Sequence, residues 1–322
     1  MSVRLVGYDE LPTSMDSGRA LVHLAAFGGV ADRRSTDVWR RRTSSLADYV
    51  GIFAVDGETV VGQTFVLRVP FTFPHGTEMV SGLAAVSTRL DYARAGIARR
   101  ILEEVHRRER ESGIRYSTLW TNRSWGAHRL YEKLGYRDVY DPPLAIRVPT
   151  SAPRRQLGRG IRRGKRSDLA EVEAAHARVG EGRWGFATRH RGFARVAAAA
   201  GELRPHDELL VSGRSGKISG YAMVDANSHR VICGELVAAS ASERASLAAA
   251  IEQRAGVVPT AFRDSAVPEL GGWLHRRGYA STPSAWFGLM ACELGRDRTR
   301  SSIVREMGTE DPRFLCMTGD RF

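Results

Sequence analysis

Cysteine is scarce in this chain of 322 residues. The three cysteines, Cys233, Cys292 and Cys316, lie far apart and show no metal-ligand spacing. Such usage argues against a disulfide framework and against a cysteine-bound metal. We therefore expect reduced thiols in a cytoplasmic protein, and no metal site.

Long apolar runs are absent as well. No run reaches the roughly 18 residues that a membrane-spanning helix requires. The N-terminal sequence MSVRLVGYDELP contains no apolar signal segment. The sequence therefore predicts no membrane association.

Acidic residues are outnumbered, with 36 Asp and Glu against 48 Lys and Arg, and the formal net charge is +12. A positive net charge of this size is typical of proteins that bind a nucleic acid, a membrane surface or an anionic ligand. Nucleic-acid binders place aromatics among the basic residues or present a reading helix, and neither pattern is evident here. We therefore expect solvated basic faces and a phosphate-bearing ligand, and no nucleic-acid partner.

The chain does have the length and apolar content of a two-domain globular protein. Hydrophobic residues make up 43% of it, which is ordinary for folded domains. The run SAPRRQLGRGIRRGK at 151–165 is rich in Pro, Gly and Arg, as linkers are. We therefore predict a first domain over 1–150, a linker over 151–165 and a second domain over 166–322.

The most informative segment is 78–136. Its apolar runs, turn residues and amphipathic spacing indicate alternating strands and helices. The predicted elements are a strand over 80–86, a turn over 87–92, a helix over 97–110, a strand over 116–121 and a helix over 125–134.

The turn that leads into the helix at Ile97 is suited to a phosphate. A helix N-terminus presents unpaired N–H groups and a partial positive charge. Small residues there let an anion approach the backbone, and arginines add charge. The residues concerned are Ala95, Gly96 and Ala98, with Arg94, Arg99 and Arg100 around them.

This segment resembles the acyl-CoA-binding core of the GNAT N-acetyltransferase superfamily, whose signature is a strand, then R/Q-x-x-G-x-G/A, then a helix. Gly96 and Ala98 occupy the two small positions, whereas Ala93 stands where the family prefers Arg or Gln. The later run AHRLYEKLGYRDV matches the family's A-x-x-x-Y-x-K-x-G-F/Y ending. Ser124 stands where the family often has Asn.

The resemblance implies an α/β (α+β) fold in which a mixed, mostly antiparallel twisted sheet is flanked by helices. It also implies an acetyl-CoA site formed by the end of the first strand, the turn and the second helix. The residues expected at this site are Val86, Ser87, Thr88, Arg94, Ala95, Gly96, Ile97, Ala98, Arg99 and Ser124.

Acetyl transfer from a thioester to an amine needs an acid, a base and a donor that polarises the carbonyl. Tyr131 matches the family's acid, and its phenol stays protonated at neutral pH. The N–H of Val86 is a candidate donor to the carbonyl oxygen. Glu78 is a candidate base acting through water, with His75 nearby, and ordered water alone is the alternative.

The second half repeats the pattern of the first. A helix again ends in an aromatic-leucine-basic run, with Leu274 at the position equivalent to Tyr131. The turn 239–244 lacks the small residues, and Glu243 would repel a phosphate. We therefore predict tandem GNAT-like domains, of which the second binds no CoA.

This layout resembles the tandem acetyltransferases of the enhanced intracellular survival type, without their sterol-carrier-like domain. In those proteins the C-terminal carboxylate can act as the base, and this chain likewise ends in Phe, at Phe322. A disordered or structural tail is the simpler alternative.

We therefore predict an acetyl-CoA-dependent N-acetyltransferase acting on a primary amine of a small molecule, such as an antibiotic, an amino sugar or another metabolite. The amine attacks directly in a ternary complex. A protein acetyltransferase and a non-catalytic acyl-CoA-binding regulatory protein are the alternatives. The sequence leaves open the acceptor, the acyl chain length and the oligomeric state, a homo-oligomer included.

Overall fold

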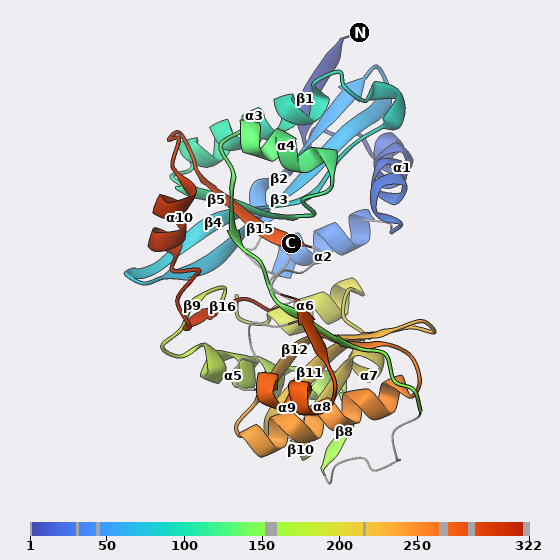
Figure 1. The fold of residues 1–322 in the computed structure, drawn as a ribbon. Coiled ribbons are helices and arrows are strands. Elements are labelled where there is room, and N and C mark those ends of the chain that lie inside the picture. Colours follow the sequence, from blue (N-terminus) through green and yellow to red (C-terminus); the bar gives the residue numbers. More distant parts are fainter. Residues whose placement is uncertain are drawn as a thin grey trace.

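The computed structural model describes residues 2–29, 32–42, 46–151, 160–214, 217–263, 270–282 and 287–317. Two twisted sheets, each flanked by helices, lie one above the other (Figure 1). Most neighbouring strands in both sheets are antiparallel. The predicted fold class is confirmed.

The first sheet has the strand order β1-β2-β3-β4-β5-β15-β6. Its one parallel neighbour pair in that path is β4 with β5. The short strands β9 and β16 attach beside β3. The bounds are β1 (Val3–Gly7), β2 (Leu46–Asp56), β3 (Thr59–Phe73), β4 (Gly76–Thr88), β5 (Tyr116–Thr121), β6 (Arg137–Tyr140), β9 (Trp184–Gly185), β15 (Gly288–Glu293) and β16 (Phe314–Leu315).

Helices cover both faces of this sheet. One face packs against α3 and α4, through a core that includes Ile101, Val105 and Tyr131. The other face packs against α1 at one end and α10 at the other. The bounds are α1 (Asp16–Phe27), α2 (Arg33–Arg42), α3 (Ile97–Glu111), α4 (Gly126–Lys133) and α10 (Arg300–Met307), with 3-10 turns at Thr13–Met15 and Leu90–Tyr92.

The second sheet has the order β14-β7-β13-β12-β11-β10-β8. Its strands β12 and β13 are parallel and are joined by α8, as β4 and β5 are joined by α3. The bounds are β7 (Leu144–Arg147), β8 (Ile161–Arg163), β10 (Leu209–Arg214), β11 (Lys217–Ala226), β12 (Val231–Ala238), β13 (Thr260–Arg263), β14 (Ala280–Thr282), α5 (Leu169–Gly180), α6 (Phe193–Ala200), α7 (Pro205–Glu208), α8 (Ala241–Ala255) and α9 (Gly271–Arg276), with a 3-10 turn at Arg166–Asp168.

Each half of the chain contributes to the other half's sheet. The sequence predicts 145–148 as a final strand of the first domain, but β7 pairs with β13 and β14 in the second sheet. In return β15, from the second half, pairs with β5 and β6 in the first sheet. Every residue of β15 is buried, which makes the strand an interior part of the first sheet. The predicted strand is thus present, but alternation along a strand does not specify its neighbour.

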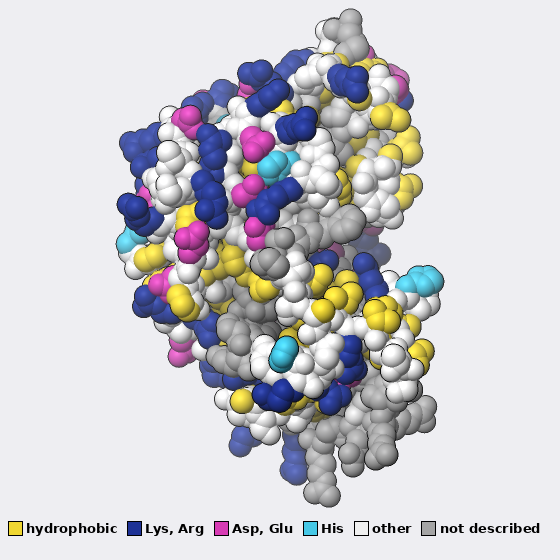
Figure 2. Space-filling view, viewed as in Figure 1, with side chains coloured by type: hydrophobic (Ala, Val, Ile, Leu, Met, Phe, Trp, Pro, Cys, Tyr) yellow, Lys and Arg dark blue, Asp and Glu magenta, His cyan; other side chains and the backbone are white. Residues whose placement is uncertain are grey.

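The basic surface is largely paired. On the face shown in Figure 2, dark blue basic side chains over the upper part of the molecule are interspersed with acidic ones. On α3, Arg107 pairs with both Glu104 and Glu111, and Arg108 pairs with Glu104. This pattern is typical of a solvated helix face. No helix in the described residues is both long and apolar enough to cross a bilayer.

Candidate active site

Strands β4 and β5 run side by side and then part. Their pairing covers Ser81 to Leu83 on β4 and Ser117 to Leu119 on β5. Beyond these pairs β4 continues to Thr88 without a further partner in β5 among the described residues. The backbone groups on that side of β4 are therefore free to bind an extended ligand, as the edge of a sheet does.

A β-bulge lies where the strands part. Gln63 pairs with Ser87 and Phe65 pairs with Ala84, so Ala85 and Val86 together oppose one residue of β3. Ala85 has a φ of 54°, in the left-handed region that a non-glycine residue seldom adopts. Bulges redirect backbone groups and occur next to active sites. No sequence signal marked this bulge.

The N-terminus of α3 lies just after β4 along the chain. Its N-cap residue is Gly96, with a φ of 75°, and no side chain caps the helix. A Cβ at Gly96 would meet no atom within 4 Å, so the space in front of this turn is open. The first-turn N–H groups of Ile97, Ala98 and Arg99 thus receive no side-chain cap and lie at a turn suited to an anion.

The arginines around this turn have different roles. Arg99 pairs with Glu103 at 2.7 Å, and Arg100 donates to the backbone oxygen of Val3 at 2.8 Å. Arg94 is exposed, and its side chain has no hydrogen-bonding partner in the part of the chain that the structure describes. Arg94 is therefore the basic side chain of this turn that is available to a ligand.

The corresponding turn of the second half is closed by its own side chains. The hydroxyl of Ser240 accepts the N–H of Glu243 at the start of α8. The carboxylate of Glu243 folds back, accepts the N–H of Ala239 at 3.0 Å and bonds to the hydroxyl of Ser219. This arrangement differs from a capping box in that the carboxylate accepts the N–H of the residue before the N-cap. It occupies the N–H of Glu243 and places a negative charge at the helix start, which disfavours a phosphate.

Tyr131 lies on α4, in the core beneath α3, and is 6% exposed. Its ring packs against that of Tyr136, with centroids 5.9 Å apart. Its hydroxyl makes no hydrogen bond to any described residue, whereas that of Tyr136 bonds to Ser117 and His106. Burial raises the pKa of Tyr131 above that of a free phenol. The Tyr131 hydroxyl is therefore protonated, and no described residue accepts a hydrogen bond from it.

Buried polar atoms without partners occur along the parting of β4 and β5. The side-chain oxygens of Ser81, Thr88 and Thr118 are buried and make no hydrogen bond to described residues. Both polar atoms of the Gln63 side chain are also buried and make no hydrogen bond to described residues. Native proteins rarely leave such atoms unpaired, so a polar ligand fits this strip.

Ser124 lies in the turn between β5 and α4. Its N–H and its hydroxyl both donate to the side-chain oxygen of Asn122, each at 2.8 Å. The hydroxyl proton is thus committed to Asn122, and Ser124 has only acceptor capacity left for a ligand. Asn122, which sequence reasoning did not single out, fixes the entry into α4.

Glu78 lies at the far end of β4. It is opposite Phe71 in the hairpin and accepts a hydrogen bond from His75 at 3.3 Å, beside the turn that joins β3 and β4. Ala84, where the strands part, is six residues further on, or about 20 Å along an extended strand. The structure therefore does not bring Glu78 together with the other predicted site residues.

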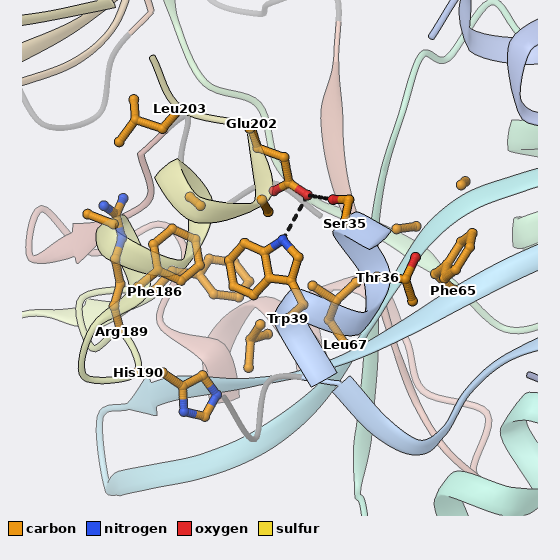
Figure 3. A pocket seen from close by; sticks show the side chains of 18 of the residues that line it. Ser35, Thr36, Trp39, Phe65, Leu67, Phe186, Arg189, His190, Glu202 and Leu203 are labelled. Atoms are coloured by element: carbon orange, nitrogen blue, oxygen red, sulfur yellow. Dashed lines mark hydrogen bonds between the residues drawn. The ribbon is translucent and has the colours of Figure 1, made fainter. Parts of the chain in front are cut away.

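A cavity of about 640 Å³ lies between the two sheets and reaches the bulge. Ala84 and Ala85 line it from β4, and Phe65, Leu67 and Val69 line it from β3. α2 and the second half of the chain supply most of the remaining wall (Figure 3). The residues from these parts include Ser35, Thr36, Trp39, Phe186, Arg189, His190, Phe193, Glu202 and Leu203.

Trp39, on α2, lines the cavity. Its indole N–H donates to Glu202 at 2.7 Å, and the hydroxyl of Ser35 donates to the same carboxylate oxygen at 3.1 Å (Figure 3). No motif marked Glu202, because it belongs to a loop after an alanine-rich helix.

The one guanidinium among the described cavity-lining residues is already paired. Arg189 bonds to Glu235 at 2.7 Å, and Glu235 also accepts from the hydroxyl of Tyr221 at 3.0 Å. The positive charge of Arg189 lowers the pKa of Glu235 in spite of its burial. This network holds the second-half wall of the cavity in one arrangement.

Comparison with known proteins is consistent with this geometry. The model of an acetyltransferase (GNAT) domain matches residues 19–139. These residues include the bulge, the start of α3 and Tyr131. No curated protein matches the sequence.

Solved structures share the fold at low sequence identity. A GCN5-related N-acetyltransferase from Kribbella flavida is 18% identical with a TM-score of 0.60, over 90% of this chain and 70% of that one. A probable N-acyltransferase from Enterococcus faecalis is 14% identical with a TM-score of 0.64, over 91% and 72%. Eis1 from Mycobacterium abscessus is 15% identical with a TM-score of 0.50, over 89% and 73%.

Proposed function

Because residues 19–139 match the model of an acetyltransferase (GNAT) domain, we propose that this chain transfers the acetyl group of acetyl-CoA to a primary amine of a small molecule. Acetyl-CoA supplies the activated thioester, and no metal takes part in the proposal. The residues of the chain bind the two substrates, polarise the carbonyl and move protons.

The observation that carries the proposal is the contrast between two helix starts. The N-terminus of α3 has no side-chain cap and faces open space, whereas that of α8 is closed by Ser240 and Glu243. An uncapped helix start next to a free arginine is suited to a pyrophosphate. We assign this contact to Arg94 and to the backbone of Ala95, Gly96, Ile97, Ala98 and Arg99.

The free edge of β4 is proposed to bind the extended arm of the acyl donor. Val86, Ser87 and Thr88 supply backbone groups there, and Ser124 supplies an acceptor from the opposite side. The N–H of Val86, redirected by the bulge, donates to the thioester carbonyl as negative charge develops on its oxygen.

Tyr131 is proposed as the general acid. As the amine forms its bond to the carbonyl carbon, the bond from that carbon to sulfur breaks and the sulfur takes the phenolic proton. The proton that leaves the amine nitrogen restores the phenol through water. We assign no proton-accepting role to Glu78, because about 20 Å of extended strand separates it from the bulge.

The division into domains is part of the proposal. Residues 1–150, without β7 and completed by β15, form the catalytic unit, residues 151–165 the linker, and residues 166–322 the degenerate copy. In the degenerate copy Leu274 replaces the phenol. The idea that the carboxylate of Phe322 acts as base falls outside the described residues.

Two measurements test the proposal. Calorimetry with CoA should give one site per chain, and substitution of Arg94 by Ala should weaken it. A screen of primary amines with acetyl-CoA, followed by release of free thiol, should reveal turnover. Binding of CoA without turnover for any amine would favour a non-catalytic regulator, and absence of binding would refute the proposal.

A further inference from the structure

We propose that the cavity between the two sheets is the acceptor site, and that Glu202 from the second half binds the ammonium of an acceptor carrying one positive charge and an apolar, aromatic body. This inference rests on the proposed function, because it takes the bulge of β4 as the place of acetyl transfer. It gives the second half a direct part in choosing the substrate.

The first argument is the pattern of hydrogen bonds to the Glu202 carboxylate. Both hydrogen bonds that Glu202 receives, from Trp39 and Ser35, go to the one oxygen Oε1. No described residue donates to Oε2, and the side chain remains open to the cavity (Figure 3). A carboxylate fixed through one oxygen and free at the other is ready for a charge-assisted hydrogen bond from an ammonium.

The environment makes this carboxylate a stronger base than a free one. Surrounding protein raises the pKa of Glu202, while the hydrogen bonds from Trp39 and Ser35 act in the opposite direction. A cation at Oε2 offsets the cost of keeping the group charged. Since a monoamine has one nitrogen, the group that Glu202 holds is also the group to be acetylated. One of its protons passes to the carboxylate before attack, and the carboxylate releases it to water before the next amine binds.

The second argument is the composition of the wall. Trp39 and Phe193 meet edge to face, with ring centroids 5.3 Å apart, and Phe65 and Phe186 add further aromatic surface. Leu67 and Val69 continue this surface along β3. Walls of this kind favour an aromatic ring and disfavour a sugar with many hydroxyls.

The third argument is the count of charges around the cavity. Asp32 is the other acidic residue among the described lining residues, and its Oδ1 accepts the N–H of Ser35 at 2.6 Å as a helix cap. A polycation would therefore leave its other ammonium groups against apolar walls or near Arg189. Each unpaired charge of that kind is costly. The described cavity therefore accommodates an acceptor with one positive charge.

The wall at Glu202 belongs to the second half, and the wall at the bulge belongs to the first. Neither half alone encloses an acceptor. The degenerate copy, which lacks a phosphate turn of its own, thus supplies the group that identifies the amine.

The test uses the full chain saturated with CoA, so that binding is measured without reaction. Calorimetry compares 2-phenylethylamine with its neutral analogue 2-phenylethanol and with the polyamine spermidine. We expect 2-phenylethylamine to bind at least tenfold more tightly than either. In Glu202→Gln, which keeps an acceptor for Trp39 and Ser35, the preference for amine over alcohol should disappear.

Glu181→Gln is the matched control, because Glu181 is an exposed residue of the same half and does not line the cavity. It should bind all three compounds as the unmodified chain does. Steady-state assays should then show a KM for the monoamine raised at least tenfold in Glu202→Gln, with the KM for acetyl-CoA unchanged.

Equal binding of 2-phenylethylamine by the Glu202→Gln variant and the unmodified chain would overturn the inference, as would preference for spermidine. Failure of CoA to bind, with amine selectivity intact, would instead refute the proposed function and leave the cation site standing.

Discussion

The indole Nε1 of Trp39 donates a hydrogen bond of 2.7 Å to Oε1 of Glu202, 163 residues later in the chain. It joins α2 of the first half to the loop after α6 of the second half. The bond fixes one oxygen of the carboxylate and leaves the other facing the cavity. A substitution at Trp39 should therefore alter the pKa of Glu202 and any function that depends on its charge.

Trp39→Phe should shift the pH dependence of acetylation. The surrounding protein raises the pKa of Glu202 and the indole hydrogen bond lowers it, so removing the indole N–H raises the pKa further. Glu202 must be charged to hold the ammonium, so the acid limb of kcat/KM for the amine should move to higher pH. Measurement of kcat/KM against pH checks this, and an unmoved limb would contradict it. Phe at position 39 keeps the aromatic wall.

Tyr131→Phe should lower kcat by about 10²-fold or more, because a general acid typically contributes that much. Calorimetry should find the affinity for acetyl-CoA unchanged. The fold should also be unaffected, since the Tyr131 hydroxyl bonds to no described residue. Tyr136→Phe is the comparison, because its hydroxyl bonds to Ser117 and His106. It should lose about 1 kcal/mol of stability and keep its turnover.

Arg99→Glu should reproduce in α3 the closed turn of α8. Position 99 is three residues after the N-cap Gly96, as Glu243 is three residues after Ser240. A carboxylate there stabilises the helix start and repels a phosphate. We expect CoA affinity to fall by about tenfold or more, a loss of about 1.4 kcal/mol in binding, without loss of thermal stability. Arg99→Ala, which removes the charge and the pair with Glu103 without adding a carboxylate, should lose less affinity by calorimetry.

Substitutions at Ala85 should show how the positive φ at this position affects stability and how the side chain affects turnover. At a φ of 54°, Gly is favoured and a β-branched residue is not. Ala85→Val should therefore destabilise the protein by about 2 kcal/mol in urea unfolding, and Ala85→Gly should change stability by less than about 1 kcal/mol. The valine should also lower turnover, because Ala85 lines the cavity. Full activity and stability of the valine variant would show that the bulge is not as described.

His106 should make the protein less stable in mild acid. Burial, with a smaller contribution from Arg110, lowers its pKa to about 4 from the ordinary 6.5. The unfolded chain therefore binds the proton first. The stability that this neutral histidine provides is complete above pH 6.5 and declines as the pH falls toward 4. From pH 7 to pH 5 the loss is about 2 kcal/mol.

Urea unfolding at the two pH values measures this decline. His106→Gln should show a smaller difference between pH 7 and pH 5 than the unmodified chain. Other groups, such as His176, whose pKa burial lowers to about 3, contribute equally to both proteins. An unchanged difference would mean that His106 titrates normally in the folded state.

The sequence by itself determined several local elements, including the turn for which we propose phosphate binding. The start of α3 at Ile97 and both ends of β5, Tyr116–Thr121, match the prediction. These features depend on nearby residues: apolar spacing selects helix or strand, and Gly96 permits the positive φ that opens the turn. The family motif around Tyr131 is likewise a contiguous run.

Only the tertiary structure decided which strands are neighbours and what encloses the cavity. Nothing in the pattern of β7 or β15 tells that each completes the other half's sheet, because an apolar strand fits any interior position of matching register. The hydrogen bond between Trp39 and Glu202 and the separation of Glu78 from the bulge of β4 were also not predictable from the sequence. Contacts between distant segments depend on how the two sheets pack, and no local pattern in the chain encodes that packing.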